Sequence, residues 1–321
     1  MPMSHDNAVW FEGAFGQIVN AVGQAVLGKT QVIRLTVAAL LAEGHILLED
    51  APGTGKTMLA RSLAAAVDGK HARIQFTPDL LPTDVTGVEV INQQTNEYEF
   101  HPGPVFASIV LADEINRASP KTQSALLEVM EEGTVTVGVN TRRVGRPFMV
   151  IATQNPIDQA GTYRLPEAQL DRFLMKTSIG YPDLDSTVEI FSGAATKNRS
   201  AQVSPVIDTA HVAQMADLAT TVFVADPILR YIATLAEATR LSGDTKIGVS
   251  IRGGLAMTRV AKVWAAAQGR EYVTADDVKT LAPVVWTHRL VIDPEAEFAG
   301  ASAEKVIAQA LSDIAVPMDR A

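Results

Sequence analysis

Apolar runs alternate with helix-spaced apolar residues along the first half of the chain. The runs that predict strands are Ile46–Leu48, Arg73–Phe76, Ser108–Ala112 and Met149–Thr153. A continuous run such as Ser108–Ala112 is typical of a strand that a parallel sheet buries on both faces. Helical spacing lies between the runs, as in Lys121–Glu132. Because buried strands alternate with helices, we predict an α/β fold with a doubly wound parallel sheet.

Two stretches of strand-type sequence interrupt this alternation. In the first, Val88–Ile91 and Tyr98–Phe100 flank a polar turn, and in the second, Thr134–Val139 and Arg142–Gly145 flank Asn140-Thr141. Short strands separated by a few polar residues are typical of β-hairpins. We therefore expect two β-hairpin inserts that project from the core.

A helical region follows the last strand signals. After Tyr181-Pro182-Asp183 the chain becomes rich in alanine at helical spacing. One helix start is marked by Thr274, which can cap the helix, with Asp276 and Asp277 in the first turn. We predict a core domain over residues 1–182 and an all-α domain over residues 183–321.

Composition narrows the classes of protein. The chain has 321 residues, 47% of them hydrophobic, which is enough to bury a large core. Its formal net charge of -9 argues against wholesale attraction to nucleic acid, although a local basic patch can still exist. Cysteine is absent, which excludes disulfides and thiolate metal sites. Because neither a signal-peptide pattern nor a bilayer-spanning stretch occurs, we expect a cytoplasmic protein without membrane insertion.

A glycine-rich loop follows the first predicted strand. The string Glu49-Asp50-Ala51-Pro52-Gly53-Thr54-Gly55-Lys56-Thr57 lies between Ile46–Leu48 and the helical pattern that begins at Met58. A strand, a Gly-rich turn and a helix N-terminus form the arrangement that holds a nucleotide phosphate, because free backbone N–H groups point into the loop. Gly53 and Gly55 let the backbone approach the phosphates. The sequence therefore predicts a nucleoside triphosphate site.

Two side chains of this loop carry the expected chemistry. Lys56 can reach the β- and γ-phosphates, and the Thr57 hydroxyl can ligate Mg²⁺. Asp50 stands where the P-loop pattern has glycine, and Asp tolerates unusual backbone angles better than most residues. The residues expected to bind the nucleotide, with Asp113 from a later strand, are Asp50, Pro52, Gly53, Thr54, Gly55, Lys56, Thr57 and Met58.

Two carboxylates close the strand Ser108–Ala112. Asp113 and Glu114 would lie at the carboxyl edge of the sheet, where such folds bind ligands. We expect Asp113 to hold Mg²⁺ and Glu114 to polarise the attacking water, while the amide of Asn155, after the next strand, orients that water or contacts the γ-phosphate. Alone, these residues also fit a solvated strand end and an ordinary Asn-Pro turn. Together with the P-loop they favour hydrolysis.

Arginines elsewhere suggest further contacts. Arg172 fits a finger that reaches the γ-phosphate of a neighbouring subunit, or a surface arginine paired with an acid. Arg252, near the start of a helix, fits a nucleotide contact or a structural role at the helix end. Arg142, Arg143 and Arg146 form a basic cluster on the second hairpin, which fits a solvated turn or a contact with a protein or nucleic-acid substrate.

Taken in order, these motifs resemble the AAA+ ATPases and, within them, the MoxR family. The resemblance covers most of the chain, from about Gly16 to Arg289. The strings that carry it are Gly53-Thr54-Gly55-Lys56-Thr57, Leu111-Ala112-Asp113-Glu114-Ile115-Asn116-Arg117-Ala118, Lys121-Thr122-Gln123-Ser124-Ala125-Leu126-Leu127-Glu128, Ala152-Thr153-Gln154-Asn155-Pro156 and Leu165-Pro166-Glu167-Ala168-Gln169-Leu170-Asp171-Arg172-Phe173.

The resemblance implies a role for each matched residue. It implies that ATP and Mg²⁺ are the cofactors, that the helical domain is a lid, and that the hairpins correspond to the helix-2 insert and the pre-sensor-1 insert. It also implies work as a chaperone or remodelling factor on protein clients, often with a partner that carries a von Willebrand factor A domain. The roles are Lys56 and Thr57 in Walker A, Asp113 and Glu114 in Walker B, Asn155 as sensor 1, Arg172 as the arginine finger and Arg252 as sensor 2.

We therefore expect a Mg²⁺-dependent ATPase that works as a homo-oligomeric ring, a hexamer, because a finger that acts in trans has no use in a monomer. Two other classes fit part of the pattern: a nucleic-acid motor or loader of the helicase-related AAA+ branch, and a nucleotide-gated binding switch with little turnover. The acidic balance and the absence of an appended DNA-binding motif count against the first. Glu114, the residue expected to polarise the attacking water, counts against a binding switch with little turnover.

Overall fold

The computed structural model describes residues 2–51, 53–155, 162–193 and 199–317. Backbone contacts divide the chain into two compact units. The first, which we call the sheet unit, comprises residues 17–165 and 177–213, and the second, the helical unit, comprises residues 1–16, 166–176 and 214–321. The predicted domain boundary between residues 182 and 183 stays a prediction.

The central sheet has the strand order β2-β5-β8-β1-β9. Parallel pairing joins β2 to β5, β5 to β8 and β8 to β1. The apolar residues of β5 and β8 are fully buried, as expected where helices cover both faces of a parallel sheet. The strands are β1 (Ile46–Glu49), β2 (His71–Gln75), β5 (Ile109–Asp113), β8 (Met149–Gln154) and β9 (Met175–Thr177). This confirms the predicted α/β fold, to which the structure adds the short edge strand β9.

Strand register brings polar residues together at one edge of the sheet. Gln75, at the end of β2, lies opposite Asp113 at the end of β5, and Ala112 lies opposite Ala152 of β8. The carboxyl ends of three parallel strands therefore meet at the same edge, which is where α/β folds bind ligands. Helix α1 (His5–Gly23) begins in the helical unit and ends in the sheet unit. The other helices of the sheet unit are α2 (Thr30–Leu41), α3 (Lys56–Ala66), α4 (Pro82–Thr86), α5 (Pro120–Glu132) and α7 (Leu184–Ser192), with short 3-10 helices η1 (Pro104–Phe106), η2 (Ile115–Arg117) and η3 (Arg199–Gln202).

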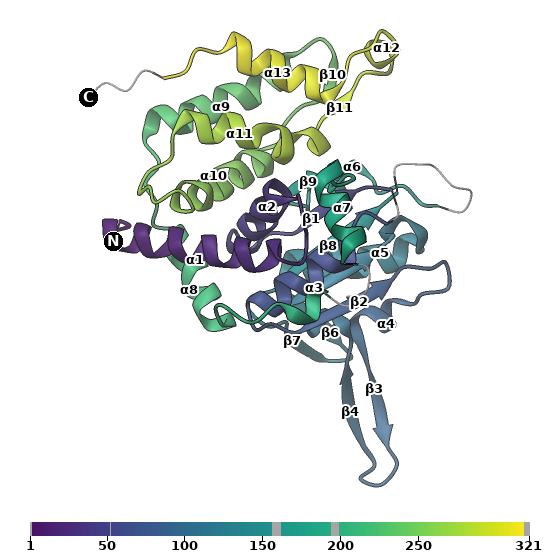
Figure 1. Cartoon of the computed structure of the whole chain (residues 1–321). Helices are drawn as coiled ribbons and strands as arrows, with labels where there is room; N and C mark the ends of the chain where they lie inside the picture. The colour runs from purple at the N-terminus through teal and green to yellow at the C-terminus, as the bar shows by residue number, and fades with distance from the viewer. Residues whose placement is uncertain (1, 52, 156–161, 194–198, 318–321) are drawn as a thin grey trace. The chain divides into compact units, whose positions relative to one another are not determined.

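Both predicted hairpins are present in the sheet unit. The first pairs β3 (Gly87–Asn92) with β4 (Glu97–Pro102) and forms the long ribbon that projects from the sheet in Figure 1. The second pairs β6 (Thr134–Val137) with β7 (Asn140–Arg143). Its turn was predicted two residues too late: Val137 pairs with Asn140, so the turn residues are Gly138 and Val139, where Gly138 takes a φ of 60°.

The basic cluster of the second hairpin is partly neutralised. The guanidinium of Arg142 donates to Glu89 of β3 at 3.1 Å and lies 4.1 Å from the ring centroid of Phe100 on β4. Arg146 forms an ion pair with Glu43. Two of the three arginines therefore serve contacts within the sheet unit, and Arg142 ties the two hairpins together.

The helical unit contains a helix bundle with one short ribbon. The predicted helix start at Thr274 is confirmed, because its hydroxyl accepts from the N–H of Asp277 and the Asp277 carboxylate accepts from the N–H of Thr274. Among the described residues, no helix is both long and apolar enough to cross a bilayer. The elements are α6 (Glu167–Leu170), α8 (Thr209–Ala219), α9 (Asp226–Leu241), β10 (Thr245–Ile247), α10 (Ile251–Ala266), α11 (Ala275–Trp286), η4 (Thr287–Arg289), β11 (Val291–Ile292), α12 (Pro294–Phe298) and α13 (Ala303–Asp313), of which α8 begins at the end of the sheet unit.

Buried His288 makes the stability of this unit depend on pH. Burial, assisted by the neighbouring charges of Arg289 and Lys176, lowers the pKa of His288 from 6.5 to about 3. Its Nε2 lies 3.0 Å from the carbonyl of Phe173, while Nδ1 has no hydrogen-bond partner among the described residues. Below pH 6.5 His288 therefore binds a proton in the unfolded chain but not in the folded chain. The free energy of unfolding consequently falls as the pH drops toward 3.

We expect the free energy of unfolding to be about 2 kcal/mol lower at pH 5 than at pH 7 because of this histidine. The measurement is denaturant unfolding across this pH range, with His288→Gln as the control because glutamine can still donate to Phe173 but does not titrate. An equal pH slope for both proteins would show that His288 is not the group responsible.

Candidate functional site

The glycine-rich loop joins β1 to α3 and has the backbone shape that the sequence predicts. Gly53 and Gly55 have φ angles of 84° and 97°, which other residues rarely adopt. Gly55 is the N-cap of α3, so the first N–H groups of the helix open into the loop. This arrangement fits a bound phosphate. Pro52 lies outside the described residues.

Asp50 stabilises the loop in a way that the sequence did not suggest. Its φ is not positive, so unusual backbone angles do not explain its presence. Instead, the buried carboxylate accepts hydrogen bonds from the N–H groups of Ile179, at 2.6 Å, and Gly180, at 2.9 Å. Two backbone donors balance the buried negative charge. Asp50 thus anchors the start of the loop to the chain after β9, and a direct contact of its carboxylate with nucleotide stays a prediction.

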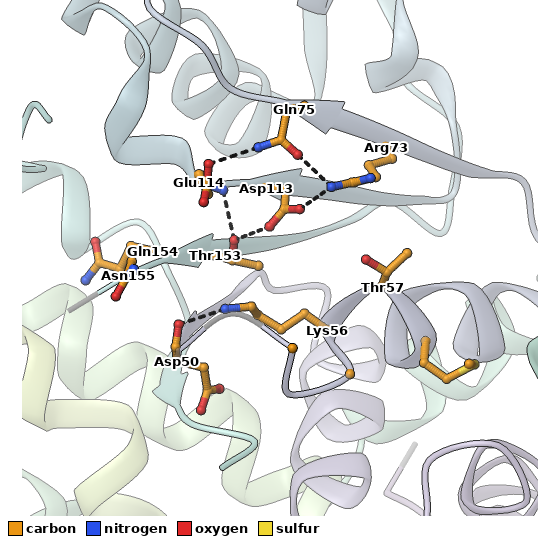
Figure 2. A pocket seen from close by; sticks show the side chains of 13 residues that line it. Asp50, Lys56, Thr57, Arg73, Gln75, Asp113, Glu114, Thr153, Gln154 and Asn155 are labelled. Carbon is orange, nitrogen blue, oxygen red and sulfur yellow. Dashed lines mark hydrogen bonds and ion pairs between the residues drawn. The ribbon is translucent and has the colours of Figure 1, made fainter. Parts of the chain in front are cut away.

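Lys56 and Thr57 open α3 beside this loop. The Lys56 ammonium donates to the backbone carbonyl of Asp50 at 2.8 Å (Figure 2). It also donates to the carbonyl of Ala51 at 3.2 Å. A phosphate oxygen would be a stronger acceptor than either neutral carbonyl. Thr54 Oγ1 donates to Ala51 at 3.4 Å, so this hydroxyl is used within the loop.

The two carboxylates at the end of β5 are held by Thr153 of β8. Asp113 Oδ1 accepts from Thr153 Oγ1 at 2.7 Å, and Thr153 Oγ1 accepts from the N–H of Glu114 at 2.9 Å (Figure 2). Glu114 has a left-handed backbone with φ of 57°, a conformation that costs about 1 kcal/mol for a residue with a side chain. The bond to Thr153 helps to hold this turn, which keeps the Glu114 carboxylate at the sheet edge.

Arginine and glutamine side chains contact both carboxylates. Arg73 Nη2 donates to Asp113 Oδ2 and to Gln75 Oε1, each at 2.6 Å. Gln75 Nε2 donates to Glu114 Oε2 at 3.1 Å, and Arg117 Nη1 donates to the same oxygen at 2.8 Å. Asp113 and Glu114 thus each have an arginine partner, and Gln75 joins the two pairs.

Sequence reasoning assigned no role to Arg73, Gln75, Thr153 or Arg117. A signal existed on β2, where two long polar residues alternate with apolar ones at the carboxyl end of the strand. Its meaning depends on the strand order, because only the pairing of β2 with β5 sets Gln75 opposite Asp113. That order could not be read from the sequence.

These side chains surround a cavity of about 530 Å³ at the carboxyl edge of the sheet. The structure therefore brings the P-loop, the Asp113-Glu114 pair and Asn155 together, as predicted. Thr57 and Asp113 both line the cavity, and a hydroxyl and a carboxylate are ligands that Mg²⁺ takes together with substrate phosphates. The residues present thus fit a nucleotide with Mg²⁺. The cavity lining includes Asp50, Gly53, Gly55, Lys56, Thr57, Met58, Arg73, Gln75, Asp113, Glu114, Thr153, Gln154 and Asn155.

Arg172 and Arg252, the remaining predicted site residues, both belong to the helical unit. Arg172 follows α6, and Arg252 is the second residue of α10. The N-cap of α10 is Ser250, which accepts from the N–H of Gly253 at 3.1 Å and donates from Oγ to Asp171 at 3.3 Å. The structure therefore links the segments that carry the two arginines. Their roles toward a nucleotide stay predictions.

Comparison with known proteins places this geometry in a family. The model for the ATPase family associated with various cellular activities (AAA) matches residues 45–175, and the AAA lid domain model matches residues 237–310. Chaperone MoxR1 of Mycobacterium tuberculosis is 39% identical over 92% of this chain and 80% of that relative. An uncharacterized Bacillus subtilis protein, YeaC, is 46% identical over 95% of both chains.

A solved structure agrees with these relatives. The crystal structure of a candidate ATPase from Cytophaga hutchinsonii is 36% identical and superposes with a TM-score of 0.91 over 98% of both chains. This chain thus combines a P-loop, a carboxylate pair at the end of β5 and a lid domain, and its relatives include a MoxR chaperone and a candidate ATPase. The chain is an ATPase that belongs to the MoxR family of AAA+ proteins.

Proposed function

We propose that this ATPase hydrolyses Mg²⁺-bound ATP as a hexameric ring and uses the energy for chaperone-like remodelling or assembly of partner proteins. The observation that carries the proposal is the single cavity that gathers Lys56, Thr57, Asp113, Glu114 and Asn155. Together these side chains cover three parts of phosphoryl transfer: phosphate binding, metal ligation and activation of water.

Binding of the phosphates falls to the loop and to Lys56. The ammonium exchanges the carbonyls of Asp50 and Ala51 for phosphate oxygens, while the loop N–H groups cradle the phosphates. Thr57 and Asp113 would hold Mg²⁺, which supplies neutralisation of phosphate charge when bound. Asp113 Oδ2 is ion-paired with Arg73, so this arginine must move away from Oδ2 when the carboxylate binds Mg²⁺.

Activation of the attacking water falls to Glu114. Arg117 and Gln75 both donate to the same carboxylate oxygen of Glu114, Oε2, so this oxygen is already engaged. We propose that Glu114 exchanges at least the Arg117 contact for the attacking water during turnover, and that Asn155 orients this water from the end of β8.

Protein clients agree with the relatives and with the charge of the chain. One relative is named a chaperone, and the net charge of -9 disfavours a nucleic-acid track. The resemblance to MoxR proteins adds a partner with a von Willebrand factor A domain. The exposed hairpin β3–β4 offers one surface for such contacts, with Val88, Val90 and Tyr98 exposed.

Ring assembly is tested by dilution. Because we assign Arg172 to the site of the neighbouring subunit, each site is incomplete when subunits separate. We expect ATP to promote assembly, and specific ATPase activity to fall on dilution toward the level of an Arg172→Ala variant. Mass photometry at each concentration reports the oligomeric state beside the activity. Constant specific activity down to a demonstrated monomer would refute the shared site.

A further inference from the structure

A fully buried arginine of the helical unit holds the segment that carries Arg172. The side chain of Arg289 is only 2% exposed, and burial lowers its pKa while the nearby Asp171 carboxylate opposes that shift. An unpaired charge in such a place would strongly destabilise the fold, so the contacts of Arg289 must compensate for its burial. They all lie within the helical unit.

All five N–H donors of this guanidinium are used. Nε donates to the carbonyl of Val285 at 2.8 Å, which ties the group to its own helix end. Nη1 donates to the Asp171 carboxylate and to its carbonyl at 3.1 Å. Nη2 donates to the carbonyls of Phe173, at 2.6 Å, and Leu174, at 3.5 Å. An arginine has five such donors, so one side chain fixes both residues that flank Arg172.

The same segment has two more attachments to the helical unit. His288 contacts the carbonyl of Phe173 at 3.0 Å, and the Phe173 ring is fully buried. Asp171 uses its second carboxylate oxygen to accept from Ser250, the N-cap of α10. Gly253 belongs to this packing, because a Cβ there would lie 3.2 Å from Arg289 Cδ and 2.7 Å from Val249.

The Asp171 side chain thus joins Arg289 to the start of α10. A buried ion pair is a poor source of stability, since apolar residues of similar size often serve as well. This ion pair instead fixes a position. Because both carboxylate oxygens of Asp171 are held by hydrogen bonds, the backbone of the next residue is held in place as well. That next residue is Arg172.

We infer that Asp171 is a positioning residue for Arg172, which it fixes to the helical unit through Arg289 and Ser250. This inference rests on the proposed role of Arg172 toward the neighbouring subunit. A misplacement of about 1 Å in a group that stabilises the transition state can cost on the order of a hundredfold in rate.

The first test is Asp171→Asn in the full chain, which keeps the size of the side chain and an acceptor for Ser250. We expect kcat to fall by about tenfold to a hundredfold, with the Kd of a fluorescent ATP analogue unchanged, because the P-loop is untouched. Unchanged kcat would overturn the inference. Where Asp171→Asn rings fail to assemble by native mass spectrometry, Asp171→Glu keeps the counter-ion of Arg289 and takes its place.

Mixed rings separate positioning from loss of structure. An Asp171→Asn subunit has an intact P-loop, so beside a Lys56→Ala subunit, whose finger is intact, it should regain turnover. Beside an Arg172→Ala subunit it should not, because neither subunit then presents a working finger. If Asp171 served only the fold of its own subunit, Asp171→Asn would inactivate its own site and leave its finger intact. Turnover would then recover beside Arg172→Ala and not beside Lys56→Ala, and the inference would fail. Absence of recovery for Arg172→Ala with Lys56→Ala would instead refute the proposed function itself.

Discussion

Lys56→Ala is expected to abolish nucleotide binding, whereas Glu114→Gln is expected to retain binding and stop turnover. Lys56 meets the phosphates in the ground state, so its loss removes affinity. Glu114 acts on the attacking water only as the reaction begins, so its loss removes rate by on the order of a hundredfold to ten-thousandfold. The amide introduced by Glu114→Gln has nearly the shape of the carboxylate and keeps an acceptor for Arg117 and Gln75.

The measurements are equilibrium binding of a fluorescent ATP analogue and steady-state release of phosphate. Thr54→Ser is a matched control within the loop, because it keeps the hydroxyl that donates to Ala51 and should change neither quantity greatly. Full ATPase activity in Glu114→Gln would show that another group activates the water. Tight binding by Lys56→Ala would show that the loop N–H groups alone hold the phosphates.

The binding-competent Glu114→Gln variant also distinguishes the classes of client. Held in the ATP state, it should retain partners that the active enzyme releases. Recovery of protein that nuclease treatment does not remove would support the remodelling role. Retention of nucleic acid, with ATPase stimulation by the same nucleic acid, would favour the motor or loader alternative in its place.

The chemistry of the site could be predicted from the sequence because it is local. The P-loop and the Asp113-Glu114 pair are each a few consecutive residues, and parallel strands necessarily bring their carboxyl ends to one edge. Most of the contacts that were missed join different strands, although Arg117 contacts Glu114 only three positions away. Gln75 reaches Glu114 only because β2 lies next to β5, and Asp50 meets Ile179 only because the chain returns beside the loop.

The grouping of residues 166–176 with the helical unit was not predictable for the same reason. The predicted boundary between residues 182 and 183 placed this segment in the core domain. Its attachment depends on Arg289, more than a hundred positions later in the chain. Arg289 gave no signal, since one arginine after a helical pattern resembles any surface charge, yet its side chain is buried.

Arg172→Ala is expected to retain ATP binding and to lose hydrolysis by about a hundredfold or more, because a finger acts mainly on transition-state charge. Arg172→Lys is the matched comparison: it keeps the positive charge and loses the planar fork, so an intermediate rate is expected if direction as well as charge matters. Equal activity of Arg172→Ala and the unmodified enzyme would show that Arg172 is a structural arginine and not a finger.

Mixed rings decide whether Arg172 acts on its own site or on that of its neighbour. An Arg172→Ala subunit has an intact P-loop, and a Lys56→Ala subunit has an intact finger, so each is inactive alone for a different reason. In a ring with both, an Arg172→Ala site that faces a Lys56→Ala neighbour has every group that it needs, and turnover should recover to the fraction set by random mixing. The control is a mixture of Lys56→Ala with the double variant Lys56→Ala/Arg172→Ala, in which no site can bind ATP and no recovery is expected. If native mass spectrometry shows mixed rings and phosphate release stays at the level of the separate variants, Arg172 does not act in trans, and the geometry that Asp171 imposes on it must serve its own subunit.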